Sequence, residues 1–285
     1  MVAEARKAPV AQRPKERPVL EMRSLQVEGV DIPFKIRADG AGPVLFSLGV
    51  RKSGSTMLHR IVSQLAARAG ATPVDIPGAF FRSGLTFNHV TTLDFNSLIK
   101  PGNIYTGFRA FPTNLAKAPG YEAALKLFMF RDPRDALVSQ YFSDAFSHSL
   151  PAGDTKGREL FLKKRDEAKA TDINEWVLAK AGSLRRTLLG YQNVLKDDKT
   201  LILRYEDYVF QKRRMIRKIQ AHFGWNVHGS HIDKIIEDID FVPEHEDRTR
   251  FVRKAIPGDH TVKLSRETIQ RLNNRLGDVL ELYDY

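Results

Sequence analysis

The residues best suited to do chemistry form a short loop between an apolar run and a helical pattern. The loop is Gly49–Thr56, with the sequence GVRKSGST, and it follows the apolar run Val44–Leu48. After it, apolar residues recur at three- and four-residue spacing as far as Gly70, a typical helix stop. A strand that enters a helix through such a loop aims unpaired backbone N–H groups and the positive end of the helix dipole at one point. The segment is therefore predicted to bind a phosphate group.

The side chains of the loop add to this backbone site. Lys52 supplies a mobile positive charge, Gly54 allows a close approach of the backbone, and the hydroxyl groups that follow add donors. The predicted phosphate contacts are Arg51, Lys52, Ser53, Gly54, Ser55 and Thr56. In a Walker A loop the lysine follows the second glycine, whereas here it precedes it. Taken alone, the loop is equally consistent with a structural turn.

A second anion site is predicted about eighty residues later. The apolar run Leu125–Phe130 is followed by Arg131, and Pro133 is placed where a first helical turn accepts proline. Arg131 offers a charged fork, and Ser139 on the following helix offers a hydroxyl group. The alternative is an ordinary turn, with an aspartate as helix cap and Arg131 in a surface ion pair. Two such segments together favour a nucleotide that carries a phosphate at each end.

The order Lys52-Ser53-Gly54-Ser55-Thr56 resembles the 5′-phosphosulfate loop of the sulfotransferases that use 3′-phosphoadenosine 5′-phosphosulfate (PAPS). Arg131 and Ser139 resemble the 3′-phosphate motif of the same family. The resemblance extends from Val44 to the C-terminus. It implies a sulfotransferase with PAPS as cosubstrate, 3′-phosphoadenosine 5′-phosphate (PAP) as product and no metal. In such an enzyme Lys52 would stabilise charge on the departing phosphate oxygen.

Two weaker segments agree with this resemblance. Tyr205, in the sequence Arg-Tyr-Glu-Asp after an apolar run, resembles the family's tyrosine near the adenine. Arg253 and Lys254 resemble the late Arg-Lys-Gly segment that closes over the 3′-phosphate. Ala255 replaces the glycine of that segment, so a backbone contact there is not implied. Without the two main motifs, this stretch would be read as a solvated basic run.

The residue expected to act as general base differs from that of the best-known branch of the family. Cytosolic sulfotransferases have a catalytic histidine in a Thr-His-Leu-Pro segment, and Gly107 stands at that position here. Other branches use a carboxylate soon after the first helix, which makes Asp75 the candidate to accept the acceptor proton. Asp75 is equally well explained as a turn residue before Pro77. His89 is a second, more distant candidate.

The absence of that histidine favours a carbohydrate or glycolipid hydroxyl as acceptor over small phenols and steroids. Residues 77–100 are predicted to form the acceptor lid, and a mixture of aromatic and basic side chains there suits a sugar that bears an acidic group. The contacts considered are Phe80, Phe81, Arg82, Phe87 and His89. The same mixture suits a lipid or aromatic pocket.

Composition agrees with these inferences without deciding between them. The formal net charge of +11 suits a polyanionic cosubstrate, nucleic acid or an anionic membrane equally, and the absence of cysteine excludes disulfides and thiol zinc sites.

Residues 1–19 are predicted to be a disordered basic tail, capable of weak contact with an anionic membrane. Residues 20–43 are expected to form a hairpin extension, and 44–285 the sulfotransferase domain. With no bilayer-spanning run or secretory signal, the chain is expected to be cytoplasmic.

From residue 44 onward, apolar strands alternate with helical patterns, which predicts an α/β fold with a parallel sheet covered by helices. The expected strands are 44–48, 74–76, 104–108, 125–130 and 200–204, and the expected helices lie near 55–69, 133–146, 171–195, 208–223 and 265–281.

Two other functions remain open from the sequence. A P-loop kinase or nucleotide-binding enzyme would use Mg²⁺–ATP, with Glu206 and Asp207 as the metal-binding acids, but the order of the loop counts against it. A basic protein that binds nucleic acid or membrane is suggested by charge alone. No nucleic-acid-binding module is recognised, so nucleic acid is not an expected partner.

Overall fold

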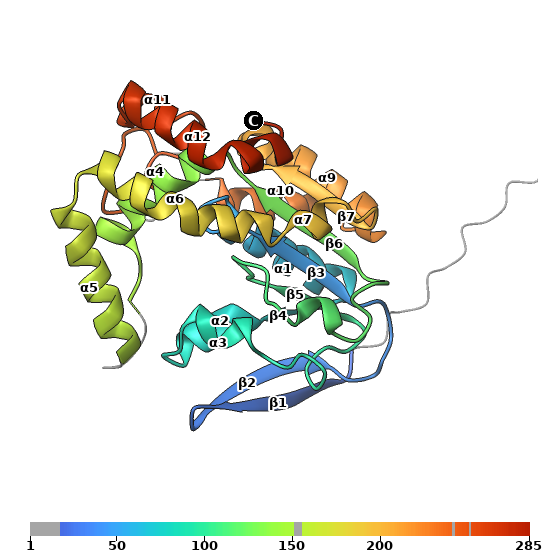
Figure 1. Cartoon of the computed structure of the whole chain (residues 1–285). Helices are drawn as coiled ribbons and strands as arrows, with labels where there is room; N and C mark the ends of the chain where they lie inside the picture. The colour runs from blue at the N-terminus through green and yellow to red at the C-terminus, as the bar shows by residue number, and fades with distance from the viewer. Residues whose placement is uncertain (1–17, 151–155, 241–242, 251) are drawn as a thin grey trace, which may run out of the picture.

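A computed structural model describes residues 18–150, 156–240, 243–250 and 252–285 of the chain. The predicted basic tail thus lies outside the described residues except for its last two positions. The fold is built on a parallel sheet, preceded by a separate two-stranded hairpin (Figure 1).

The sheet has five parallel strands in the spatial order β4-β5-β3-β6-β7. Their bounds are β3 Leu45–Gly49, β4 Thr72–Asp75, β5 Asn103–Thr106, β6 Leu125–Phe130 and β7 Thr200–Arg204. The strand β3 lies between β5 and β6, so the chain reverses its direction across the sheet at the β3–β6 pair. Ligands of such folds bind at the carboxyl ends of the strands beside that reversal. The predicted α/β fold is confirmed.

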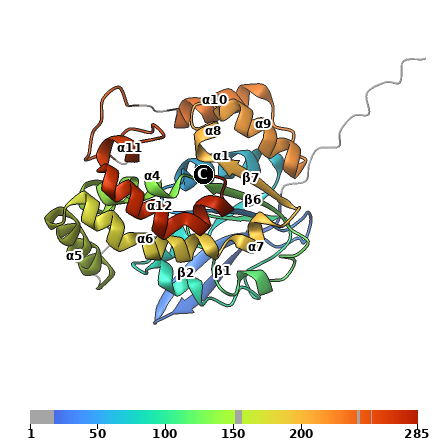
Figure 2. The same cartoon turned by 45° about the horizontal axis from the view of Figure 1, so that its top comes forward.

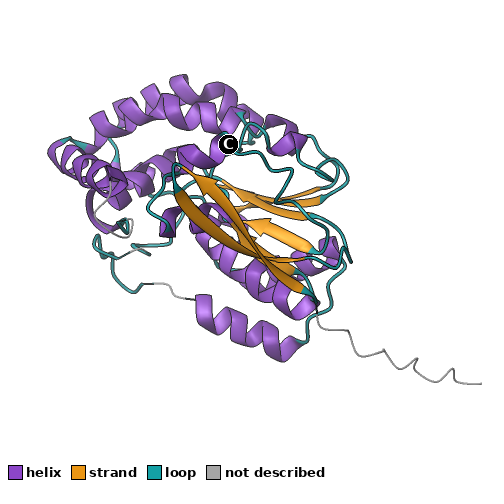
Figure 3. Ribbon diagram, turned by 90° about the horizontal axis from the view of Figure 1, so that it is seen from below, coloured by secondary structure: helices purple, strands orange, loops and turns teal. Residues whose placement is uncertain are grey.

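Helices cover both faces of the sheet, so the central strands are buried on both sides (Figure 3). On one face lie α1 Ser55–Ala69, α9 Lys212–Phe223 and α10 Gly229–Ile239. On the other lie α4 Pro133–Phe142, α6 Ile173–Leu189 and α12 Arg266–Leu282, with α6 and α12 side by side (Figure 2). The apolar spacing along α1 is explained by this burial.

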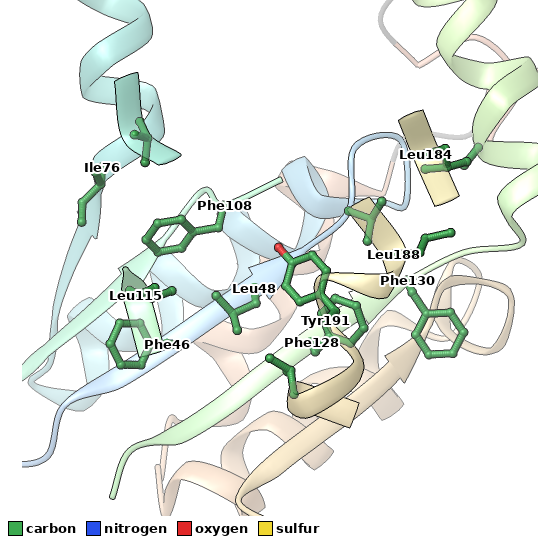
Figure 4. Close-up of a cluster of buried hydrophobic side chains, with 14 of the residues drawn as sticks. Phe46, Leu48, Ile76, Phe108, Leu115, Phe128, Phe130, Leu184, Leu188 and Tyr191 are labelled. Carbon is green, nitrogen blue, oxygen red and sulfur yellow. The ribbon is translucent and has the colours of Figure 1, made fainter. Parts of the chain in front are cut away.

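The core fixes the end of the strand that carries the phosphate loop. The ring of Tyr191 stacks on that of Phe128 from β6, with centroids 4.4 Å apart (Figure 4). Its hydroxyl group donates a hydrogen bond of 2.8 Å to the carbonyl oxygen of Gly49, the last residue of β3. Buried packing therefore sets the point at which the chain leaves the sheet.

The N-terminal hairpin consists of β1 Leu20–Val27 and β2 Val30–Arg37, as expected. Its turn residues Glu28 and Gly29 have φ angles of 50° and 78°, the left-handed pair that a two-residue hairpin turn needs. Alternate residues of β2 pack into the core: Ile32, Phe34 and Ile36.

Several elements differ from the sequence-based expectation. The strand expected at 74–76 ends at Asp75, because Asp75 caps α2 Ile76–Arg82 and Pro77 fits its first turn. The single helix expected at 171–195 is divided into α6 and α7 Gln192–Leu195. The helix α5 Lys156–Ala170 was not predicted, since Ala168 is its one buried residue among those described. The remaining short elements are α3 Phe87–Thr91, the 3₁₀ turn Leu115–Lys117, the π-helical turn Ser143–Ser147, α8 Tyr205–Tyr208 and α11 His260–Lys263.

Candidate active site

The loop between β3 and α1 has the form of an anion cradle. Gly54 is the N-cap of α1, with a φ angle of 80°, and it has no side chain to cap the first amide groups. Lys52 also lies in the left-handed region, with φ 67°, where a residue with a side chain is strained. A side-chain carbon at Gly54 would lie 2.6 Å from the ring of Tyr205, so only glycine fits beneath that ring.

Positive charge is concentrated around Lys52. Burial lowers the pKa of Lys52 to about 7, and the neighbouring Arg51, Arg131 and Arg109 act in the same direction, while Asp144 opposes them. Arg51 forms an ion pair with Asp144. Crowding like charges in a partly buried loop costs free energy, which a bound phosphate group offsets.

The second predicted anion site lies next to the first, because β6 adjoins β3. Arg131 follows β6 directly, and its side chain is 8% exposed. One guanidinium nitrogen donates to Asp135 at 3.0 Å and to the carbonyl oxygen of Ile256 at 3.2 Å. The guanidinium also lies over the ring of Tyr205, 4.6 Å from its centroid. Its buried Nε has no hydrogen-bond partner among the described residues, which leaves a donor for a ligand.

Asp135 joins this arginine to a distant segment. Its carboxylate accepts hydrogen bonds from the backbone N–H of Gly258 at 2.7 Å and from both the backbone and the ring of His260, at 2.9 and 2.7 Å. Burial by itself would raise the pKa of Asp135, but His260 and Arg131 hold it well below its usual range. The cap of α4 is Asp132 rather than Asp135, because the Asp132 side chain accepts from the N–H of Arg134. Asp135 therefore organises the site.

The late basic segment lies against the same site. Lys254 donates to Asp259 at 3.0 Å, and Arg253 pairs with the same carboxylate. Ala255 has φ 57°, so it keeps the left-handed backbone that glycine favours. The hydroxyl group of Tyr205 donates to its carbonyl oxygen at 3.3 Å. Ser139 lies on α4 and is partly buried.

Asp75 lies at the end of β4, at the same edge of the sheet. One carboxylate oxygen accepts the N–H of Gly78 at 2.9 Å, and the other lies 3.3 Å from Arg82 and 3.9 Å from Nε2 of His59. A side-chain carbon at Gly107 would lie 2.1 Å from Oδ1 of Asp75. The Asp75 carboxylate thus fills the space that a side chain at position 107 would need.

The other residues considered as general base or metal ligand form hydrogen bonds or ion pairs that give them a structural role. His89 forms a capping box with Thr86, and its Nε2 lies 3.2 Å from Glu28 in the hairpin turn. Glu206, the acid of the kinase alternative, accepts from the backbone N–H of Asp132 at 3.0 Å and from the hydroxyl group of Tyr285 at 2.7 Å. Within the described ranges, no group of three potential metal-ligating side chains comes together.

A model of the sulfotransferase domain matches residues 43–283. The chain therefore belongs to the sulfotransferase family, and the predicted enzyme class is confirmed. Among curated proteins, none matches the chain in sequence.

Two solved structures are similar to the chain, and the first of them shows the same fold. A mouse sulfotransferase, SULT7A1, complexed with PAP has a TM-score of 0.55 and 16% identity over 92% of this chain and 98% of its own. Retinol dehydratase in complex with androsterone and inactive cofactor PAP has a TM-score of 0.45 and 14% identity over 91% of this chain and 90% of its own.

In the part of the chain that the structure describes, no helix is long and apolar enough to cross a membrane.

The sequence reasoning missed the residues that connect the motifs. The contact between Asp135 and His260 links segments more than a hundred residues apart. Asp259 holds the late basic segment through its ion pair with Arg253. His59 is four residues after Ser55 and therefore on the same side of α1. That spacing is the one signal that marks His59 in the sequence.

Proposed function

We propose that the protein transfers a sulfuryl group from PAPS to a hydroxyl group of a carbohydrate or glycolipid. The observation that carries this proposal is the position of Tyr205. Its ring touches Gly54 of the phosphate loop and, at 4.6 Å, the guanidinium of Arg131. One aromatic surface between two anion sites suits an adenine nucleotide with a phosphate at each end.

The residues around Tyr205 fit this cosubstrate. Three features offer binding capacity for an anion: the glycine N-cap of α1, the crowded cations near Lys52, and the Nε of Arg131, which has no hydrogen-bond partner among the described residues. When bound, PAPS supplies the sulfuryl group. Lys52 and the loop hydroxyl groups hold the negative charge that develops on the phosphate side, while Arg131, with Arg253 and Lys254, holds the other phosphate.

Asp75 is the proposed proton acceptor for the attacking hydroxyl group. It is a carboxylate at the carboxyl edge of the sheet, where ligands of this fold bind. It also fills the space beside Gly107, the position of the catalytic histidine in the cytosolic branch. A base placed there contributes by taking the proton as the new oxygen–sulfur bond forms.

The acceptor class is inferred from an aromatic and basic surface to which α2 contributes Phe81. Phe81, His148 and Phe161 pack together, with ring centroids 4.9 to 6.2 Å apart. A hollow beside them is lined by Arg51, Asp144, His148, Phe161, Lys164 and Arg165. Aromatic faces suit sugar rings, and the cations suit an acidic substituent. Cytoplasmic location and contact of the basic tail with an anionic membrane stay predictions.

The test is transfer from PAPS to acidic oligosaccharides, acidic glycolipids, neutral glycans and a small phenol. We expect transfer to the acidic sugars, because the hollow carries an excess of cations. The double variant Lys164→Ala/Arg165→Ala should raise their KM by about tenfold, with little effect on neutral glycans. Lys169→Ala, an exposed lysine on the same helix, is the control. Transfer to the phenol alone would refute the acceptor class.

A further inference from the structure

His59 occupies a defined position between the phosphate loop and the proposed base. It lies one turn into α1, and its Nδ1 is 3.1 Å from the hydroxyl oxygen of Thr106 at the end of β5. Thr106 is fully buried, so its hydroxyl hydrogen needs a partner within the protein. With Nδ1 as that acceptor, the proton of a neutral His59 ring lies on Nε2.

Burial keeps this ring neutral. Desolvation lowers the pKa of His59 below its usual value, Asp75 opposes that shift, and Arg109 and Arg82 reinforce it. These three charged groups come from β4, the segment after β5, and α2, the elements that surround the ring. His59 therefore faces the site as a hydrogen-bond donor.

The distance between His59 and Asp75 allows both side chains to bind the same ligand atom. Nε2 lies 3.9 Å from Oδ2 of Asp75, beyond the range of a direct hydrogen bond. An oxygen atom to one side of the line that joins Nε2 and Oδ2 reaches both at about 2.8 to 2.9 Å, the ordinary length of such bonds. The two side chains lie at the edge of the sheet where the phosphate loop begins its helix, and Asp75 also faces the exposed Arg82.

We propose that the acceptor hydroxyl group binds between His59 and Asp75, with His59 as a substrate-positioning residue. The proposal rests on the proposed function. The acceptor oxygen accepts a hydrogen bond from Nε2–H of His59 and donates its own proton to Asp75. As the oxygen–sulfur bond forms, that proton passes to the carboxylate. The bond from sulfur to the phosphate oxygen breaks, and its electrons remain on that oxygen beside Lys52. His59 thus directs the free lone pair of the acceptor toward sulfur.

Steady-state kinetics with varied acceptor test this role. His59→Ala should reduce kcat/KM for the acceptor by about 10- to 100-fold, with PAP affinity changed by less than about twofold. His59→Gln keeps an N–H donor and should recover part of the loss. Thr106→Val, which removes the hydroxyl that fixes the ring, should give a smaller loss. His231→Gln, at an exposed position on α10, is the matched control.

A measurement that does not depend on turnover tests the ring directly. Long-range proton–nitrogen NMR spectra of the histidine rings, assigned with His59→Gln, should show a neutral His59 with its proton on Nε2. A proton on Nδ1 would overturn the assignment, because Nε2 of His59 would then face the bound hydroxyl group as an acceptor. Full activity in His59→Ala would overturn it as well. Absence of transfer and PAP binding in the wild type would instead overturn the proposed function.

Discussion

Lys52→Ala is expected to reduce sulfuryl transfer by at least about 10²- to 10³-fold, the usual cost of removing one group that stabilises developing charge. Lys52 lies at the uncapped start of α1, among three arginines that raise the local potential. No other lysine of the loop can replace it. Single-turnover rates with PAPS held above saturation separate this loss from weaker binding. Turnover within tenfold of the wild type would contradict the assigned role.

The same substitution should stabilise the folded protein at neutral and acidic pH. The pKa of Lys52 is lowered from 10.5 to about 7, so between these values the unfolded chain binds more protons than the folded one. Stability therefore rises with pH across that window, and below about pH 7 the buried charge lowers it fully. Lys52→Ala removes this destabilising charge. We expect its Tm to exceed that of the wild type by a few degrees at about pH 6 and the gain to shrink toward about pH 10. A lower Tm at pH 6 would contradict the electrostatic account.

Asp75→Asn is the second substitution with a large expected effect. Asparagine caps α2 as well as aspartate does, so the fold is kept while the proton acceptor is lost. Transfer should fall by about 10²- to 10⁴-fold, with PAP affinity nearly unchanged in calorimetry. Unchanged turnover would remove Asp75 from the proton-transfer step.

Gly107→Ala should produce a similar loss by a different route. The new side-chain carbon would lie 2.1 Å from Oδ1 of Asp75 and must displace the carboxylate. Gly107 also has φ 85°, so the substitution adds backbone strain. Gly224→Ala is the matched control, because Gly224 has φ 65° and nothing within 4 Å of an added carbon. Equal losses of transfer in both variants would show that strain, rather than displacement of Asp75, is responsible.

Local motifs made part of the site predictable. Lys52, Gly54 and Arg131 could be placed because each comes shortly after the end of a buried strand, and parallel strands end at the same edge of a sheet. The alternation of apolar runs and helical patterns likewise predicted the parallel sheet. Asp75 was named from its place after the first helix, but its contact with the space beside Gly107 depends on the pairing of β4 with β5.

The remaining parts of the site depend on contacts that local spacing does not encode. Asp135 reaches His260 across 125 positions of the chain, and no periodicity in either segment indicates this pairing. The helix α5, which supplies Phe161 and two cations of the hollow proposed for the acceptor, has no apolar face to reveal it. The strained φ of Lys52 and Ala255 also lies outside what residue type predicts, since neither is glycine.

The central claim is that two neighbouring anion sites bind one nucleotide with a phosphate at each end. Calorimetric titration of the wild type and of Arg131→Ala with PAP, and separately with ATP and Mg²⁺, tests it most directly. The account predicts tight binding of PAP without metal, weaker by about 10- to 100-fold in Arg131→Ala, and no preference for Mg²⁺–ATP. Preference for Mg²⁺–ATP, or PAP affinity unchanged in Arg131→Ala, would contradict it.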